Sequence, residues 1–168
     1  MEPVRSQPLD PARHDLTAFR SSEHELDTWL AEHAAGADAR RVARTFVWCR
    51  PGADVVVAYY SLTGHCLVRD DLPRAPGRGS PTEVPAVLLA RLALDQSLHG
   101  QGSGGVLLVD ALTRVVAATE LVAARFVVVD ALHDRATGFY AHHGFRSIPG
   151  TLRLVQKISD VTAALAAS

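Results

Sequence analysis

The sequence has little cysteine, and it lacks both a long apolar run and a signal-peptide core. Its 168 residues include only two cysteines, Cys49 and Cys66, which is too few for a disulfide framework or a cysteine-rich zinc site. We expect both to be free thiols, as in a cytoplasmic protein. Charged residues interrupt every apolar run well before the about 18 residues that suggest a membrane span. The N-terminus, Met1-Glu2-Pro3-Val4-Arg5, has no apolar stretch for secretion. These absences predict a cytoplasmic protein without a membrane partner.

Net charge is also nearly absent. Lys and Arg total 17 and Asp and Glu total 18, so the formal net charge is −1. This balance excludes a basic coat over the whole surface, but it leaves a local basic patch open. The chain is 48% hydrophobic, which is enough to build a core without disulfides or metal. At this length we expect a single domain covering residues 1–168.

The pattern of apolar residues predicts two helices, then antiparallel strands. Ser22 and Glu25 have the spacing of a capping box, which would begin a helix. Aromatic and β-branched residues around the Pro51-Gly52 turn signal predict a hairpin. The expected elements are a helix over 22–35, a short helix over 37–44, strands over 44–49 and 54–62, and a surface loop over 69–83.

The second half predicts one β-α-β unit followed by a helix and two strands. The expected elements are a strand over 84–95, a helix opening within 100–105, a strand over 126–129, a helix over 136–143 stopped by Gly144, and strands over 145–148 and 152–158. Helices, antiparallel strands and a single β-α-β unit, in this order, favour a mixed α/β or α+β fold over a doubly wound sheet.

A glycine cluster, Gly100-Gln101-Gly102-Ser103-Gly104-Gly105, follows the strand that ends near Asp95 and opens the long helix. Glycines let the backbone approach a ligand, and free N–H groups at a helix N-terminus favour an anion such as a pyrophosphate. No Lys-Ser/Thr pair follows, so this is not an ATP-binding P-loop. A glycine-rich turn that holds no ligand stays open as an alternative.

A dinucleotide site is a second alternative, because Gly100, Gly102 and Gly105 satisfy G-x-G-x-x-G, and Asp130 ends the next strand. Two features argue against it. The residues Gln96–His99 separate the strand from the glycines, and only one β-α-β unit follows.

Two signatures resemble the GNAT superfamily of N-acetyltransferases. The stretch from His99 to Gly104 resembles its Arg/Gln-x-x-Gly-x-Gly/Ala motif, with His99 in place of Arg or Gln. The stretch from His133 to Phe145 resembles its second motif, with His133 in place of Asn. The resemblance implies a GNAT fold, in which a mixed central sheet is splayed at the acetyl-CoA site and flanked by helices. The residues that it assigns to acetyl-CoA are Leu92, Ala93, Leu94, His99, Gly100, Gln101, Gly102, Ser103, Gly104, Gly105, His133, Ala136 and Tyr140.

The likeness extends upstream to the GNAT toxins of type II toxin–antitoxin pairs. It is carried by Phe19, Leu26-Asp27-x-Trp29-Leu30, Arg44-Thr45-Phe46-Val47, Ala58-Tyr59-Tyr60-Ser61-Leu62, Pro85-x-x-Leu88-Leu89-Ala90-Arg91-Leu92-Ala93-Leu94-Asp95, Val129-Asp130-Ala131 and Phe139-Tyr140. This resemblance implies acetylation of the α-amine of aminoacyl-tRNA, which blocks translation. It also implies a ribbon-helix-helix antitoxin as partner and a homodimer.

The implied reaction needs a proton for the leaving thiolate and a neutral amine. The family resemblance makes Tyr140 the general acid, and we expect the backbone N–H of Leu94 to meet the oxyanion. A core aromatic packed with Phe139 and Phe145 is the alternative for Tyr140. A dedicated base is not required, because an α-amino group has a pKa of about 7.7–8.0. Glu83, Asp95 and His65 are the candidates if one exists.

Six arginines are candidates for contacts with nucleic acid: Arg40, Arg41, Arg44, Arg74, Arg78 and Arg91. Arg40, Arg41 and Arg44 would share one side of the short helix; a solvated helix face is the alternative. The eight histidines form no pair with metal-ligand spacing, so we expect no metal. Two other functions stay open, namely acetylation of a small-molecule or protein amine, and a CoA-binding module that partners a DNA-binding antitoxin with little turnover.

Overall fold

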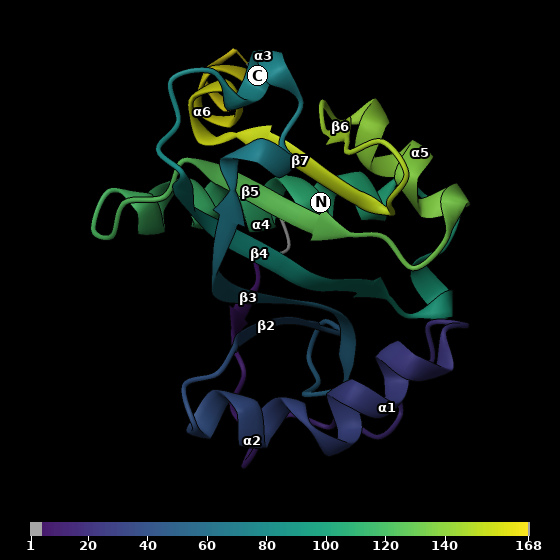
Figure 1. The fold of residues 1–168 in the computed structure, drawn as a ribbon. Coiled ribbons are helices and arrows are strands. Elements are labelled where there is room, and N and C mark those ends of the chain that lie inside the picture. The colour runs from purple at the N-terminus through teal and green to yellow at the C-terminus, as the bar shows by residue number, and fades with distance from the viewer. Residues whose placement is uncertain (1–4, 168) are drawn as a thin grey trace. The chain divides into compact units, whose positions relative to one another are not determined.

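The computed structural model describes residues 5–167, so Met1–Val4 and Ser168 lie outside the described residues. The described strands form one sheet with the hydrogen-bonded order β1-β2-β3-β4-β5-β7-β6. The strands are β1 Gln7–Pro8, β2 Arg44–Cys49, β3 Val56–Val68, β4 Glu83–Leu94, β5 Phe126–Asp130, β6 Arg146–Ser147 and β7 Arg153–Lys157 (Figure 1). The helices are α1 His24–Glu32, α2 Ala34–Ala39, α3 Arg74–Gly77, α4 Ser103–Thr119, α5 Asp134–His142 and α6 Ile158–Ala166, with short 3₁₀ turns η1 Arg69–Asp71 and η2 Gln96–Leu98.

The sheet is mixed, which confirms the predicted fold class. The pairs β2–β3, β5–β7 and β6–β7 are antiparallel, whereas β4 and β5 are parallel and are joined through α4. The parallel pairing runs from Ala86–Phe126 to Leu89–Val129. Strand β4 then continues to Leu94, so its last residues, Ala90–Leu94, extend beyond the paired segment. Strand β5 itself ends one residue after this ladder, at Asp130, so the last residues of β4 have no residue of β5 paired with them.

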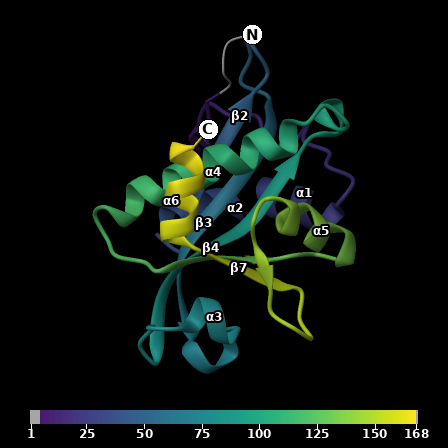
Figure 2. The same ribbon diagram turned by 90° about the horizontal axis from the view of Figure 1, so that it is seen from above.

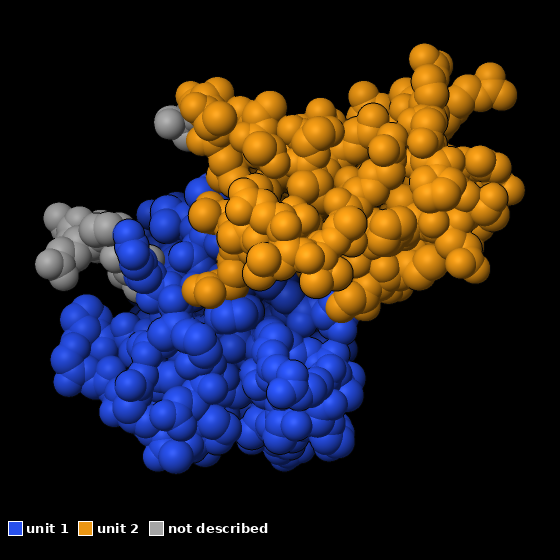
Figure 3. Space-filling model, turned by 90° about the vertical axis from the view of Figure 1, so that its left-hand side faces the viewer, with its two compact units in different colours: residues 1–63, 90–111 blue, residues 64–89, 112–168 orange. Residues whose placement is uncertain are grey.

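The described chain divides into two compact units (Figure 3). The first comprises the chain up to Thr63 together with Ala90–Ala111, and its core gathers Phe19, Leu30 and Tyr59 around buried aliphatic side chains. The second comprises Gly64–Leu89 and the chain from Leu112 onward, with a core built on Val84, Phe126 and Val155. The single domain over residues 1–168 stays a prediction.

The predicted capping box is wrong. Ser22 has a φ of +79°, and Glu23 is the residue that precedes α1, where its side chain makes no capping hydrogen bond. The chain turns sharply at Ser22, so this side chain is not placed to cap. Instead, the Asp27 carboxylate accepts two hydrogen bonds from Ser21, one from its backbone N–H at 2.9 Å and one from its side-chain hydroxyl at 2.6 Å. The start of α1 is therefore held by Asp27, a residue of its first turn, which accepts hydrogen bonds from the preceding segment at Ser21.

The expected helix over 37–44 is also wrong. The region 22–39 breaks at His33 into α1 and α2, and α2 ends at Ala39. Arg41 has a φ of +60°, which ends helical geometry, and Arg44 opens β2 opposite Leu62 of β3. Arg40, Arg41 and Arg44 thus share no helix face, because strand pairing takes over from helix propensity after Ala43.

Two further segments differ from the expectation. The predicted loop 69–83 contains η1 and α3, and the last predicted strand is followed directly by α6, as Figure 2 shows. Ile158 and Val161 are the buried residues of α6, and their spacing of three is the helical signal that could have revealed it. No described helix combines the length and apolarity needed to cross a bilayer.

Gly144 ends α5 as predicted, and it offers a test of the fold. Its φ is +95°, and a Cβ there would lie 2.9 Å from Nε2 of Gln156. We expect Gly144→Ala to lower the free energy of unfolding by about 1–2 kcal/mol, since left-handed backbone is costly for alanine. The matched control is Gly138→Ala within α5, where the new Cβ meets no atom within 4 Å apart from its chain neighbours and the nearby helix backbone. That change should stabilise the helix by roughly 0.5–1 kcal/mol. Urea unfolding measures the free energy of unfolding of both variants. Equal values would contradict the left-handed conformation of Gly144.

Candidate functional site

The glycine turn has the backbone geometry that an anion cradle needs. Gly100 and Gly102 have φ values of +74° and +77°, and beyond each glycine and its two chain neighbours no atom lies within 4 Å of where a Cβ would stand. The turn feeds into α4 at Ser103, whose first-turn N–H groups have no partner within the helix. Both glycines are exposed. The turn is therefore open, with its amides able to face a phosphate.

Hydrogen bonds from neighbouring residues hold this turn in place. The Asp95 carboxylate accepts the backbone N–H of Ser97 at 3.0 Å and that of Arg20 at 2.9 Å. Gln101 donates from Nε2 to the Ser97 carbonyl at 3.0 Å. Burial raises the pKa of Asp95, but these hydrogen bonds outweigh it and lower the pKa overall. Asp95 is thus an ionised cap, which makes it a poor general base.

The His99 side chain contacts the last residue of β4. Its Nε2 lies 3.0 Å from the carbonyl oxygen of Leu94. A carbonyl only accepts, so Nε2 carries a proton and donates. The residues predicted to meet the pantetheine arm occupy the end of the same strand: Leu92 and Leu94 are half-buried and Ala93 is buried. The first unit therefore brings together Leu92–Leu94 and the turn residues His99–Gly105.

The second unit carries the other signature on α5. His133 caps this helix, because its Nδ1 accepts the backbone N–H of Ala136 at 3.2 Å. Tyr140 is buried, and its ring packs edge-on against Phe139 and Phe145 at centroid distances of 5.1 and 5.7 Å. Burial raises the pKa of Tyr140 to about 12, so the phenol keeps its proton at neutral pH and can donate it. This geometry suits both an acid and a core aromatic.

The other candidate bases are differently placed. Glu83 is an exposed residue at the start of β4. His65, on β3, has Nε2 at 3.0 Å from Nη1 of Arg153. The sequence did not predict this contact of Arg153 with His65, because the position of Arg153 depends on the pairing of β7 with β5.

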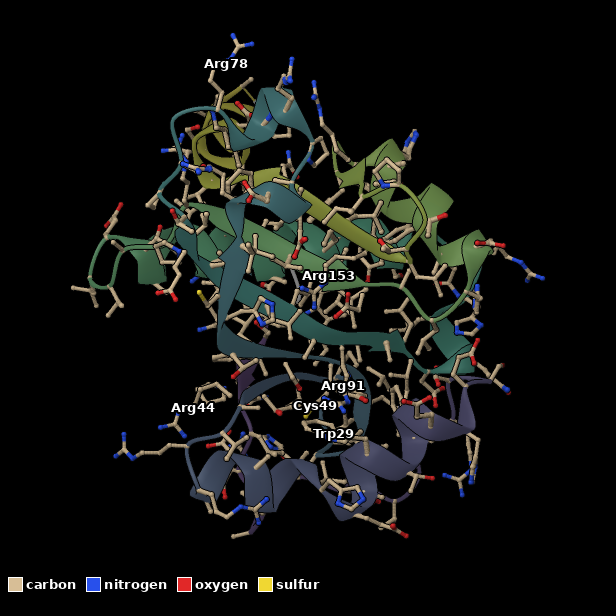
Figure 4. All side chains as sticks on the ribbon, in the orientation of Figure 1. Trp29, Arg44, Cys49, Arg78, Arg91 and Arg153 are labelled. Carbon is tan, nitrogen blue, oxygen red and sulfur yellow. The ribbon has the colours of Figure 1, made fainter. Side chains whose placement is uncertain are left out.

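The six arginines have three different environments. Arg44 pairs with Asp38 at 2.6 Å. Arg91 is half-buried, and its guanidinium lies 4.0 Å from the Trp29 ring centroid (Figure 4), a contact that the sequence did not reveal. The remaining four are exposed: Arg40, Arg41, Arg74 and Arg78. Among residues 5–167 no group of three or more His, Cys, Asp or Glu could hold a metal ion, and Cys49 and Cys66 are free.

Comparisons with known proteins point to one group of enzymes, although no family model matches the sequence. A protein of Mycobacterium tuberculosis described as a tRNA-acetylating toxin is 38% identical over 150 residues, which is 89% of each chain. The structure of a Tyr-to-Phe variant of KacT superposes with a TM-score of 0.90 at 26% identity, covering 97% of this chain and 99% of KacT. AtaT complexed with acetyl-methionyl-tRNAfMet superposes with a TM-score of 0.87 at 29% identity, covering 96% and 98%. An AtaT variant is also known with acetyl-CoA and the C-terminus of its antitoxin AtaR, with a TM-score of 0.81 at 28% identity, covering 97% and 98%.

The cap at His133 gives a stability prediction. His133→Ala removes the acceptor for the Ala136 N–H, and we expect it to cost about 1 kcal/mol of unfolding free energy. His133→Asn keeps a side-chain acceptor at the cap and should stay within a few tenths of a kcal/mol of the wild type. Thermal and urea unfolding of the pair measure this. A His133→Ala protein as stable as His133→Asn would show that the imidazole does not cap α5.

Proposed function

The chain belongs to the family of the tRNA-acetylating GNAT toxins, and we propose that it transfers the acetyl group of acetyl-CoA to the α-amine of aminoacyl-tRNA and so blocks translation. The observation that carries this proposal is the 38% identity to a tRNA-acetylating toxin across 89% of the chain. The open glycine turn at the start of α4 supports it independently. Neither a small-molecule acceptor nor a CoA-binding module without turnover has a comparable observation behind it.

Acetyl-CoA fits the residues of the first unit. The exposed turn from His99 to Gly105 offers backbone N–H groups to the pyrophosphate, and side chains on Gly100 or Gly102 would be strained. The end of β4, Leu92–Leu94, lies beyond the pairing with β5, so its backbone is suited to hydrogen-bond the pantetheine amides. Ser103, Gly104 and Gly105 form the rest of this cradle. His133 and Ala136, at the start of α5, are the further residues that we assign to acetyl-CoA.

The reaction needs one bond made and one broken. The neutral amine nitrogen attacks the thioester carbonyl, the C–N bond forms, the C–S bond breaks, and the sulfur leaves with the electron pair. The backbone N–H of Leu94 stabilises the oxyanion, and Tyr140 donates its proton to the thiolate. The attacking amine loses a proton to water, from which the Tyr140 phenolate recovers its own. Because the pKa of Tyr140 is about 12, the acid is fully protonated before each turnover.

The partners follow from the family. AtaT is known in complex with the C-terminus of an antitoxin, and we infer an antitoxin partner for this chain, of the ribbon-helix-helix type. We further infer a homodimer and action in the cytoplasm, where aminoacyl-tRNA is used. The single domain over residues 1–168 belongs to the same proposal.

The role of Tyr140 is tested by Tyr140→Phe with purified aminoacyl-tRNA and labelled acetyl-CoA. We expect kcat to fall by about 100- to 10,000-fold, because general acid catalysis is lost, while acetyl-CoA affinity is retained. The matched control is Tyr60→Phe, which also removes a buried hydroxyl; that of Tyr60 donates to Asp110 at 2.7 Å. This control should lose stability but keep kcat. If Tyr140→Phe keeps the wild-type kcat, Tyr140 is a core aromatic only.

The arginine contacts are tested by salt dependence. The double change Arg40→Gln with Arg41→Gln removes two exposed charges. We expect a higher KM for aminoacyl-tRNA and a salt slope shallower by about 0.7–0.9 for each phosphate that the protein no longer neutralises. Arg50→Gln is the control, since Arg50 is also exposed but is not one of the six candidate arginines. The KM for acetyl-CoA should not change. An unchanged salt slope in the double variant would remove these residues from the tRNA contact.

A further inference from the structure

One part of the toxin-like pattern, Val129-Asp130-Ala131, has no role in the scheme above. Asp130 is the last residue of β5, and it lies opposite Arg153, the first residue of β7. The two form a two-point ion pair, with Nε donating to Oδ1 at 2.7 Å and Nη2 to Oδ2 at 2.9 Å. The guanidinium is thus clamped in one orientation, and its charge is neutralised by its own strand neighbour.

The third nitrogen of Arg153 fixes the state of His65. Nη1 of Arg153 lies 3.0 Å from Nε2 of His65 on β3. A guanidinium only donates, so Nε2 must accept, and the proton of a neutral imidazole must then reside on Nδ1. Asp130, Arg153 and His65 therefore form a chain of hydrogen bonds, which we call the relay. It selects one tautomer of His65 and occupies the nitrogen that a general base would use.

The charges around His65 keep it neutral. Burial lowers the pKa of His65, and Arg153 from β7 lowers it further, whereas Asp130 from β5 raises it. The hydrogen bonds from Arg153 lower the pKa of Asp130 despite its partial burial. The hydrogen bonds to Asp130 and, to a smaller extent, the charge of Asp71 in η1 raise the pKa of Arg153. The arrangement favours a neutral donor, N–H at Nδ1, over an imidazolium.

The surroundings of the relay suit a neutral oxygen. Asp130 directly follows Val129, where the pairing of β5 with β4 stops, and the His65 ring is half-buried. Arg153 also lines a hollow of about 520 Å³ together with Cys66, Leu67, Asp71, Ile148 and Thr151. A guanidinium already paired with a carboxylate has little charge left for a phosphate, but its remaining N–H groups can still donate. A neutral acceptor, such as the carbonyl oxygen of an ester, therefore suits these surroundings better than a phosphate does.

We propose that His65 is a substrate-binding residue, which donates its Nδ1–H to the ester of aminoacyl-tRNA, and that Asp130 and Arg153 are positioning residues that hold it in this tautomer. The inference rests on the proposed function, because it needs aminoacyl-tRNA as the acceptor. It also removes His65 from the candidate bases. The α-amine must then reach the enzyme already neutral, and the pKa of an α-amino group, about 7.7–8.0, allows this for a share of the molecules at neutral pH.

The first test compares His65→Gln with His65→Leu in acetylation of purified aminoacyl-tRNA. Glutamine can accept from Arg153 and donate an N–H, whereas leucine can do neither. We expect His65→Leu to raise the KM for aminoacyl-tRNA by about 3- to 10-fold at unchanged kcat, the loss typical of one neutral hydrogen bond. His65→Gln should stay within about twofold of the wild type. The KM for acetyl-CoA should be unchanged in both.

The second test observes the imidazole directly. ¹⁵N NMR of the full chain, with His65 assigned by difference from His65→Gln, should show the proton on Nδ1 between pH 6 and 8. Arg153→Met should release the ring to the other tautomer and raise the pKa of His65, because a cation that lowers it is gone. The activity of Arg153→Met relative to the wild type should therefore fall as pH rises across this range, as the imidazolium loses its proton.

The outcomes separate the two proposals. A wild type that never acetylates aminoacyl-tRNA contradicts the proposed function. Wild-type acetylation with an unchanged KM in His65→Leu contradicts only the role of His65. A proton on Nε2 in the wild type overturns the relay, whatever the kinetics. A purely structural relay would lower the stability of the His65 and Arg153 variants without changing the pH dependence of their relative activity.

Discussion

The early end of the β4–β5 ladder shapes the candidate acetyl-CoA site more than any other feature of the sheet. Parallel pairing stops at Leu89–Val129, yet β4 continues to Leu94 in extended conformation. Backbone N–H and C=O groups that lose a ladder partner must find another. The structure meets part of this demand internally, since His99 donates to the Leu94 carbonyl. The proposed pantetheine contacts would meet the rest, so the end of the ladder accounts for both the local hydrogen bonds and the proposed ligand.

Two histidines depart from the family pattern, and each makes a hydrogen bond that supports the element in which it lies. His133 stands in place of the usual Asn, and its Nδ1 performs the capping that an Asn side chain provides. His99 stands in place of Arg or Gln, and it joins the turn to the end of β4. Neither departure leaves the signature without its local support, which argues against a degenerate enzyme that has lost its cofactor site.

The sequence was most informative where a residue type is required by backbone geometry. Gly100, Gly102 and Gly144 all have positive φ, and each lies in a turn or helix end that was predicted. Prediction failed where tertiary pairing decides. The stretch around Arg41 left helical geometry because β2 pairs with β3, and Ser22 turned away from its expected cap. The relay of Asp130, Arg153 and His65 joins residues far apart in the chain, so no local pattern could reveal it.

Identifying the acceptor of the acetyl group would test the proposed activity most directly. The wild-type protein and acetyl-CoA labelled in the acetyl group would be added to a cell-free translation mixture, and the labelled species would be separated. We expect label to appear on aminoacyl-tRNA, mild alkaline hydrolysis to release it as an N-acetylated amino acid, and translation to stop. Label confined to proteins or small amines, with translation continuing, would contradict the proposed activity.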